Sequence, residues 1–161
     1  MNSDFIIRQA NPADVPHIFK LIEALAEYEQ LTHQVTGSSA QLQEHLFGDR
    51  TYAEAIVVEI ENKIVGFALF FPNYSTFLTK PGIHLEDLFV LPEYRRQGIG
   101  KALLSYLSEI AIARDAGRIE WSVLDWNENA IAFYESMGAK ILTDWRICRV
   151  TDQAEIINNK K

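Results

Sequence analysis

A short run of basic residues and glycines near the middle of the chain could bind phosphate. It reads Arg95-Arg96-Gln97-Gly98-Ile99-Gly100, with Lys101 directly after it. Glycines allow a pyrophosphate to approach backbone N–H groups closely, and the unpaired amides at the start of a helix attract such an anion. The basic side chains add positive charge. The run therefore predicts a site for a nucleotide-like tail, while a simple turn into a helix would explain the same residues without a ligand.

Two common phosphate loops do not fit this run. A P-loop requires Lys-Ser or Lys-Thr after its glycines, and neither pair follows Gly100. A dinucleotide-binding fingerprint requires a third glycine at the position where this chain has Leu103. The sequence therefore excludes a P-loop ATPase and a Rossmann-type enzyme.

Metal and thiol chemistry find little support in the sequence. The four histidines are scattered without ligand spacing, and only His84 has a carboxylate two residues away, at Glu86. The single cysteine, Cys148, cannot form an internal disulfide, and its place between Ile147 and Arg149 in an apolar strand segment indicates a small buried residue. We therefore expect no metal site and no thiol nucleophile.

The elements that would position the phosphate run alternate between strands and helices. β-Branched and aromatic residues predict strands, and apolar residues at three-or-four spacing predict helices. We expect strands over residues 5–8, 53–61, 63–71, 83–90, 118–124 and 141–150. We expect helices over residues 11–28 and 38–47, from residue 99 to a stop at Gly117, and over 129–137. Residues 73–82, with Pro81 and Gly82, are expected to form a loop.

This order predicts a mixed α/β fold in a single domain over residues 1–161. The strands at 53–61 and 63–71 flank Asn62-Lys63 as in an antiparallel hairpin. The strands at 83–90 and 118–124 are parallel if the helix between them is a right-handed crossover. We therefore expect a central sheet with antiparallel and parallel pairs, flanked by helices.

The composition is that of a globular protein with an acidic surface. Hydrophobic residues make up 48% of the 161 residues, and the formal net charge is -7. That acidity argues against a nucleic-acid binder and would attract a cationic substrate, although solubility is the simpler explanation. Residues 1–30 lack a signal-peptide pattern, and the longest apolar run, residues 64–71, is far shorter than the ~20 residues of a spanning helix. We expect a cytoplasmic protein without a membrane segment.

The phosphate run resembles the acetyl-CoA loop of the GNAT superfamily of N-acetyltransferases. That loop is Arg or Gln, two residues, Gly, one residue, then Gly or Ala, and residues 95–100 match every position. Further segments resemble the spermidine/spermine (diamine) and thialysine acetyltransferase branch, namely residues 26–29 (AEYE), 85–90 (LEDLFV), 125–128 (DWNE), 133–134 (FY) and 145–146 (WR). The resemblance implies a GNAT-like fold whose strands splay apart at the CoA site.

The resemblance also implies that acetyl-CoA is the acetyl donor. Backbone groups of Leu88, Phe89 and Val90 would bind the pantetheine arm as an added strand. Other contacts would come from the phosphate run and from the segment before the last helix, that is Arg95, Arg96, Gln97, Gly98, Ile99, Gly100, Lys101, Asn127, Glu128, Asn129 and Ala130. On sequence alone, Asn127 could equally be a helix cap.

Two proton transfers are implied in the same way. Tyr134 would protonate the departing CoA thiolate, although its spacing from Ile131 also fits a packed aromatic residue. A Lys-like amine, with a pKa of ~10.4, must lose a proton before it attacks, and Glu86 is the candidate base, acting through water. Strand alternation places Glu86 and Asp87 on opposite faces, so both could serve one pocket only if the strand has a bulge. Otherwise Asp87 would carry a charge on the solvent side or anchor a loop.

The resemblance assigns four residues to the amine acceptor, namely Glu29, Glu86, Asp87 and Trp126. Carboxylates would hold the distal ammonium of the acceptor, and the indole face could attract it. As alternatives, Glu29 could be a solvated residue at a helix end, and Trp126 could be a half-buried core residue.

These features lead to one main hypothesis and two alternatives. The main hypothesis is direct acetyl transfer to a primary amine of a small basic acceptor, such as a diamine, a polyamine or a thialysine- or lysine-like compound. The alternatives are acetylation of a protein lysine or another amine, and a CoA-binding sensor domain that transfers nothing. The resemblance also implies a homodimer, and we expect neither a nucleic-acid nor a membrane partner.

Overall fold

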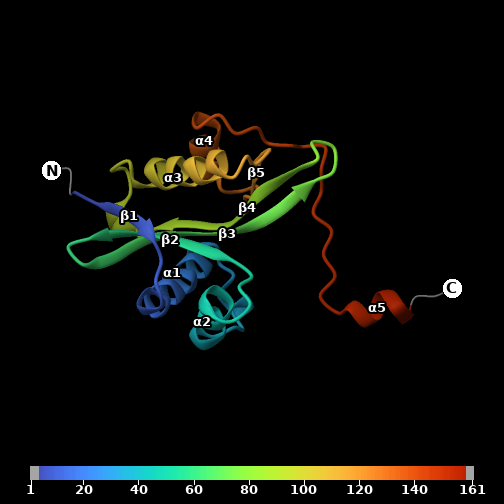
Figure 1. Cartoon of the computed structure of the whole chain (residues 1–161), viewed down its shortest axis with the longest axis horizontal. Helices are drawn as coiled ribbons and strands as arrows, with labels where there is room; N and C mark the ends of the chain where they lie inside the picture. Colours follow the sequence, from blue (N-terminus) through green and yellow to red (C-terminus); the bar gives the residue numbers. More distant parts are fainter. Residues whose placement is uncertain (1–3, 159–161) are drawn as a thin grey trace. The chain divides into compact units, whose positions relative to one another are not determined.

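The computed structural model describes residues 4–158 as two compact units, Met1–Ser122 and Val123–Lys161. The larger unit contains the sheet and helices α1 to α3, and the smaller unit contains α4 and α5 (Figure 1). The single domain expected over residues 1–161 stays a prediction.

The larger unit is built on a five-stranded sheet in the order β1-β2-β3-β4-β5. The strands are β1 (Ile6–Gln9), β2 (Glu54–Ile60), β3 (Lys63–Ser75), β4 (Lys80–Val90) and β5 (Ile119–Glu120). Consecutive strands are antiparallel except for β4 and β5, which are parallel. The predicted α/β fold with a sheet of mixed direction is confirmed.

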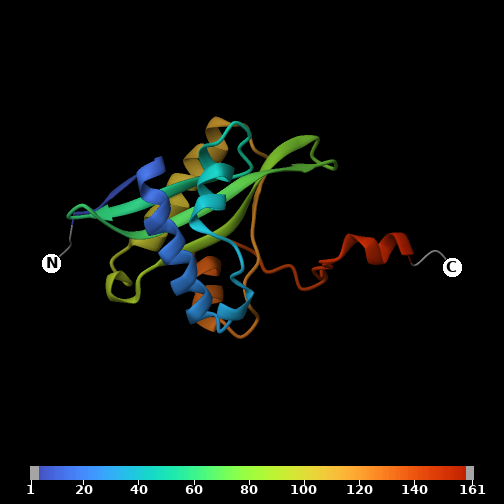
Figure 2. The ribbon, with the colours of Figure 1, turned by 90° about the horizontal axis from the view of Figure 1, so that it is seen from below.

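Helices cover both faces of this sheet. α1 (Val15–Tyr28) and α2 (Ser39–Phe47) lie on one face and α3 (Ile99–Ala113) on the other, as Figures 1 and 2 show. Between α1 and the sheet, Ile18, Val57 and Phe67 are fully buried. Each such side chain contributes roughly 1.5–3 kcal/mol of hydrophobic stabilisation. The apolar face of α1 therefore fixes that helix against β2 and β3.

The predicted hairpin between β2 and β3 is present. Glu61 and Asn62 form its tip, with φ values of 49° and 62°. Two consecutive residues with positive φ are typical of the type I′ turn, whose twist matches that of antiparallel strands.

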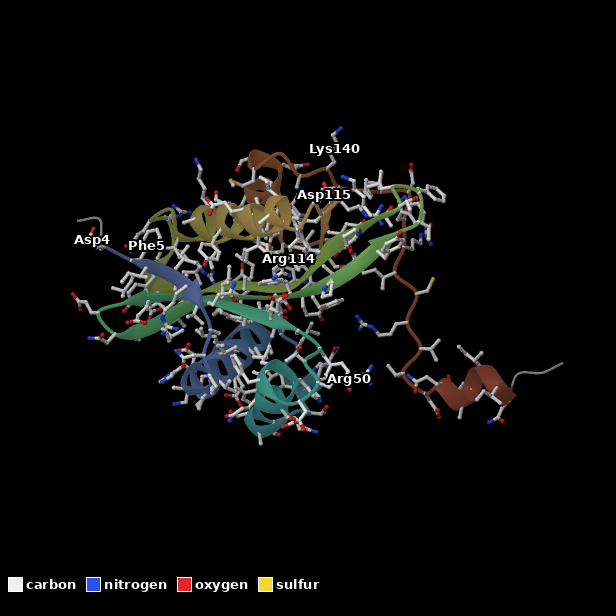
Figure 3. The ribbon with its side chains drawn as sticks, viewed as in Figure 1. Asp4, Phe5, Arg50, Arg114, Asp115 and Lys140 are labelled. Carbon is white, nitrogen blue, oxygen red and sulfur yellow. The ribbon has the colours of Figure 1, made fainter. Side chains whose placement is uncertain are left out.

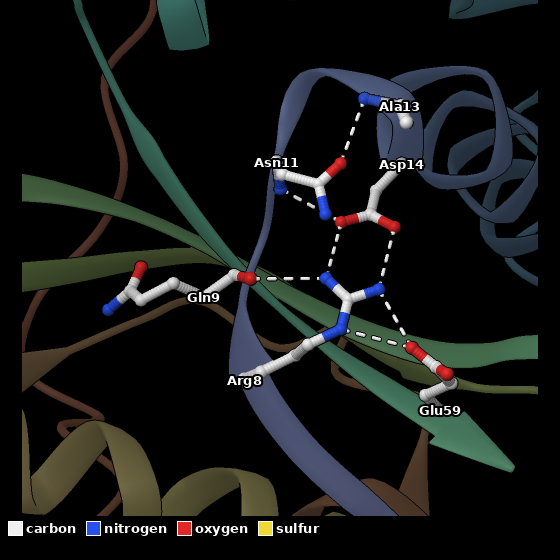
Figure 4. A network of polar contacts seen from close by, with 6 residues as sticks. All are labelled: Arg8, Gln9, Asn11, Ala13, Asp14 and Glu59. Atoms are coloured by element: carbon white, nitrogen blue, oxygen red, sulfur yellow. Dashed lines mark hydrogen bonds and ion pairs between the residues drawn. The ribbon is translucent and has the colours of Figure 1, made fainter. Parts of the chain in front are cut away.

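Arg8 of β1 joins the first strand to the start of α1 (Figure 4). Its guanidinium donates to both carboxylate oxygens of Asp14, at 2.6 and 2.9 Å, and to Glu59 Oε2 of β2, at 2.8 Å. Asp14 is 5% exposed and also accepts from the backbone N–H of Asn11, at 2.8 Å. The hydrogen bonds from Arg8 hold the pKa of Asp14 below its usual value. We call Arg8, Asp14 and Glu59 the paired network.

Arg114, directly after α3, ties that helix to β2 (Figure 3). Its two terminal nitrogens donate to both oxygens of Glu54, at 2.6 and 2.7 Å. The guanidinium also lies 6.0 Å from the centre of the Phe70 ring. A bidentate pair of this kind restricts the position of both side chains.

The loop predicted over residues 73–82 is wrong. β3 instead continues to Ser75 and β4 begins at Lys80, so the two strands form one long hairpin. Pro81 suggested a break because proline lacks the N–H that a central strand donates, and β3 also contains a proline, Pro72. Both prolines lie where the hairpin has no third strand, since β2 pairs only as far as Phe70 and β5 pairs only from Ile83. There the missing N–H costs little.

Two other strand predictions need correction. The strand expected over residues 118–124 is reduced to Ile119–Glu120, because only these residues pair with β4. Residues 141–150 form no strand and are all exposed. Cys148 is therefore exposed rather than buried. The apolar residues of this segment predicted burial wrongly, because a segment that does not pair with a strand of the sheet has no partner to bury its side chains.

The smaller unit is organised around α4 (Glu128–Ser136), which corresponds to the helix predicted over residues 129–137. Asn127 caps its start, accepting from the N–H of Ala130 at 3.2 Å. Gly138 follows the helix with a φ of 92°. A second short helix, α5 (Gln153–Asn158), lies near the end of the described chain.

Candidate active site

The phosphate run forms an open helix start in the larger unit. Gly98 is the N-cap of α3, has a φ of 83° and makes no side-chain cap. A Cβ added at Gly98 would meet nothing within 4 Å. The helical ladder begins where Ala102 N–H donates to Gly98 C=O at 2.9 Å, so the amides of Ile99, Gly100 and Lys101 have no partner within the helix. This end of α3 has the space and the donors that a pyrophosphate needs.

One edge of β4 is open next to this helix start. Within residues 4–122, β5 pairs with β4 only at Ile83 and His84, while β4 continues to Val90. Leu91 N–H donates to Val65 C=O across the β3 side, at 3.0 Å. The backbone N–H and C=O groups of successive residues point alternately to the two sides of an antiparallel strand. Those of Leu88 and Val90 therefore point away from β3, to the open side. The pairing of β4 with β5 thus ends before the residues where the resemblance places the pantetheine arm.

A bulge in β4 changes the direction of its two acidic residues. Leu69 of β3 pairs with Asp87 and the next residue, Phe70, pairs with Leu85, so Glu86 is the additional residue. A bulge of this kind interrupts side-chain alternation. The strand therefore has the bulge that is required if Glu86 and Asp87 are to serve one pocket.

The charges of Glu86 and Glu29 both act on Asp87, and we call these three carboxylates the acidic cluster. Burial first, and then the charges of Glu86 and Glu29, raise the pKa of Asp87 to about 7. Burial also raises the pKa of Glu29, which is the residue directly after α1. The solvent-facing position considered for Asp87 is not observed, because this side chain is half-buried.

His84 is the other polar side chain beside the acidic cluster. Its Nε2 lies 3.5 Å from Glu86 Oε2, and its ring stacks on Phe71 with centroids 4.9 Å apart. Within residues 4–158, no lysine or arginine forms an ion pair with a member of the cluster. Among residues 4–158, His84 is therefore the basic side chain that lies within ion-pair distance of the cluster.

The two arginines of the phosphate run lie differently. Arg96 is exposed and has a φ of 61°. Arg95 is half-buried, and its Nε donates to Val90 C=O at 2.8 Å. The Arg95 guanidinium also lies over the rings of Tyr28 and Phe89, at 4.7 and 5.2 Å. Sequence reasoning gave Tyr28 no role, because a ring contact between residues so far apart in the chain has no local signal.

The smaller unit carries the remaining predicted residues. Tyr134 is buried, 9% exposed, and its ring lies 5.3 Å from that of Phe133. Asn127 is buried and makes the cap described above, so the capping alternative is confirmed for it. Glu128 and Asn129 are exposed, and Trp126 is 50% exposed.

Among residues 4–158, no group of three or more His, Cys, Asp and Glu side chains could hold a metal ion. Over the same range, every helix is too short or too polar to cross a bilayer.

Comparisons with known proteins agree with this geometry. The chain is 37% identical to the L-ornithine N5-acetyltransferase NATA1 of Arabidopsis thaliana, over 92% of this chain and 85% of that protein. It is 36% identical to the thialysine N-epsilon-acetyltransferase of Bos taurus, over 92% and 94%. A solved aminoglycoside acetyltransferase from an uncultured soil metagenomic sample has the same fold, with a TM-score of 0.76 at 21% identity over 91% of this chain and 97% of that one.

The family assignment rests on most of the chain. Residues 19–139 match the family described as Acetyltransferase (GNAT) family. Enzymes of this family use acetyl-CoA, and the thialysine acetyltransferase relative lies in the branch that the sequence resembled. The chain therefore belongs to the acetyltransferase (GNAT) family and is an N-acetyltransferase.

Proposed function

We propose that this N-acetyltransferase transfers acetyl directly to a primary amine of a small basic acceptor, such as a diamine, a polyamine or a thialysine- or lysine-like compound. The observation that carries the proposal is the acidic cluster, in which burial raises the pKa of Asp87 and of Glu29, and the charges of Glu86 and Glu29 raise that of Asp87 further. An ammonium group of the acceptor would supply the opposite charge. Relatives named for ornithine and thialysine support a small amine as acceptor.

Acetyl-CoA, when bound, supplies the acetyl thioester. The outward backbone groups of Leu88 and the N–H of Val90 are suited to hydrogen-bond its pantetheine arm as an added strand, with Phe89 between them; the Val90 C=O already accepts from Arg95. The open amides of the phosphate run, together with Arg96 and Lys101, are suited to hold its pyrophosphate. By resemblance we assign further contacts to residues 127–130.

The chain's own side chains would then move two protons. Glu86 takes the proton of the attacking ammonium through water, and Asp87 and Glu29 hold the acceptor's distal ammonium. Asp87, with a pKa of about 7, is ionised in part at neutral pH and is a second candidate for the base. Tyr134 donates its phenolic proton to the departing thiolate. No covalent enzyme intermediate is needed, because both substrates are held together.

The test is acetyl-CoA-dependent thiol release with thialysine, ornithine, lysine, spermidine, a short diamine and a lysine peptide. Glu29→Gln should raise the KM of the preferred amine about 10-fold, as expected when one charge contact is lost. Glu27→Gln is the matched control, because Glu27 is exposed near the same helix end, and it should change KM less than about twofold. Tyr134→Phe keeps the packing and should lower kcat about 100-fold.

Other outcomes would select the alternatives. Turnover of the lysine peptide alone would favour a protein substrate. Tight CoA binding without turnover of any amine would favour a sensor. Equal KM changes in Glu29→Gln and Glu27→Gln would remove the acidic cluster from acceptor binding.

We also propose a homodimer, on the basis of the family resemblance. Large apolar side chains exposed between residues 141 and 150 support it, with Trp145 78% exposed and Ile147 71% exposed. Sedimentation velocity should give twice the chain mass of 18.4 kDa. Trp145→Glu should shift the protein toward the single-chain mass, and a wild type that sediments as one chain at all concentrations would contradict the proposal.

A further inference from the structure

Arg95 lies in the phosphate run, but its charged group contacts residues outside that run. Nε donates to the carbonyl of Val90, and the guanidinium carbon lies over the ring of Tyr28, 4.7 Å from the ring centroid. A planar guanidinium can donate in its plane and stack through its face at the same time, which a lysine cannot do. Arg95 therefore bridges the end of β4 and the end of α1.

The neighbouring arginine shows that this position is specific. Arg96 has a positive φ and an exposed side chain, whereas Arg95 has an extended backbone and a half-buried one. Consecutive residues with such different backbone angles direct their side chains differently. Arg96 thus remains available to an anion at the start of α3, while the Arg95 guanidinium is already engaged.

The ring that Arg95 covers belongs to the residue before Glu29. At this helix end, Glu29 N–H donates to Leu25 C=O and Leu31 N–H donates to Ala26 C=O, at 2.9 and 2.8 Å. These bonds set the direction in which Glu29 leaves the helix. Within residues 4–158, Arg95 forms no ion pair with Glu29, Glu86 or Asp87, so its contacts with Val90 and Tyr28 are what link it to this helix end.

We propose that Arg95 is a positioning residue that ties the acetyl-CoA loop to the end of α1 and so places Glu29, rather than a ligand of the pyrophosphate. Its effect on acceptor binding rests on the proposed function, because that function puts the amine beside Glu29. Its effects on CoA affinity and on amide exchange at the end of α1 do not depend on the proposed function.

The experiment compares Arg95→Gln with Arg96→Gln by three measurements on the full chain. These are the Kd of CoA by calorimetry, amide exchange over residues 25–31 by mass spectrometry, and the KM of the preferred amine. Arg95→Gln should leave the Kd of CoA within about threefold, raise exchange about 10-fold and raise the amine KM about 10-fold. Arg96→Gln should weaken CoA about 10-fold and leave exchange unchanged.

Tyr28→Leu removes the ring from the same contact without touching the loop. It should reproduce the faster exchange, and adding Arg95→Gln to it should give little further change, because both variants break one interaction. If Arg95→Gln does not fold, Arg95→Lys and Tyr28→Leu are compared with Arg96→Gln by the same three measurements. The proposal is overturned if loss of the guanidinium weakens CoA as much as Arg96→Gln does while exchange stays unchanged. Failure of every amine as a substrate would instead refute the proposed function, since affinity and exchange are measured without turnover.

Discussion

The paired network and the acidic cluster are two groups of carboxylates in the same unit, and their charges are balanced differently. In the paired network, Asp14 and Glu59 share the guanidinium of Arg8, and the pKa of Asp14 is lowered. In the acidic cluster, burial and then the charges of Glu86 and Glu29 raise the pKa of Asp87 to about 7.

This difference separates a stabilising role from a binding role. A buried carboxylate that accepts several charge-assisted hydrogen bonds favours the folded state. Carboxylates gathered without a cation oppose it, and such groups are found where a protein must bind or react. The comparison therefore predicts that substitutions in the two groups have opposite effects on stability, and that only the acidic cluster affects catalysis.

The largest expected effect is on activity. Asp87→Asn should lower kcat/KM for the preferred amine about 100-fold at pH 8, because the wild-type carboxyl is then ionised. At pH 6 the wild-type carboxyl is mostly protonated, since its pKa is about 7, so the loss should be smaller. A pH profile of kcat/KM for both proteins checks this. A loss of equal size at both pH values would show that Asp87 acts through its shape and not its charge.

The second effect is a loss of stability from the paired network. Asp14→Asn should lower the free energy of unfolding by about 2 kcal/mol at pH 7, because Arg8 loses a charged acceptor. The folded-state pKa of Asp14 is lowered, so this stabilisation is present above the unfolded pKa of ~3.9 and is lost as pH falls through the folded value. Urea unfolding at pH 7 and pH 3 should show the gap between the two proteins closing. A gap of constant size would argue against the charge of Asp14 as its cause.

A smaller effect of opposite sign is expected in the acidic cluster. The folded-state pKa of Asp87 is raised, so the wild type loses stability as pH rises from about 4 to about 7. Asp87→Asn should therefore raise the free energy of unfolding by about 1 kcal/mol at pH 8 and change it little at pH 4. Urea unfolding of the same preparations measures this, and a destabilised variant at pH 8 would reverse the comparison.

The smallest effect provides the control. Lys80 Nζ and Asp115 Oδ1 lie 2.7 Å apart, but the Asp115 side chain is 85% exposed. Asp115→Asn should change the free energy of unfolding by less than about 0.5 kcal/mol, because exposed ion pairs contribute little. A change as large as that of Asp14→Asn would mean that burial does not distinguish the paired network from the surface.

Prediction of the fold succeeded where signals were local and failed where partners decided the outcome. The helices expected from residues 11 and 38 and the hairpin expected at Asn62 are present, because each depends on a few adjacent residues; Asn11 and Ser38 cap the two helix starts. Pro81 suggested a loop, yet it lies within β4, because no third strand requires its N–H. The apolar pattern of residues 141–150 predicted a strand. A strand also needs a second strand to pair with, and the local pattern does not tell whether one is present.

The candidate site divides in the same way. The open helix start at Gly98 follows from the order of glycines and the helical face after them, so the sequence was sufficient to predict it. The bulge at Glu86 could only be stated as a condition, because register depends on β3. Arg95 contacts Val90 and Tyr28, whereas Arg96 has a positive φ and an exposed side chain. Nothing in the sequence distinguishes these two adjacent arginines.

By itself, the sequence determined the family, the class of fold and the segment suited to bind phosphate, since these depend on residue types at short, fixed spacing. Only the tertiary structure decided which charges act together. It placed Glu29 of the α1 end beside Asp87 of β4, and it engaged Arg95 with Tyr28. Electrostatic and stacking energies depend on distance in space, and residues far apart in the chain reach those distances only when the sheet and its helices have packed.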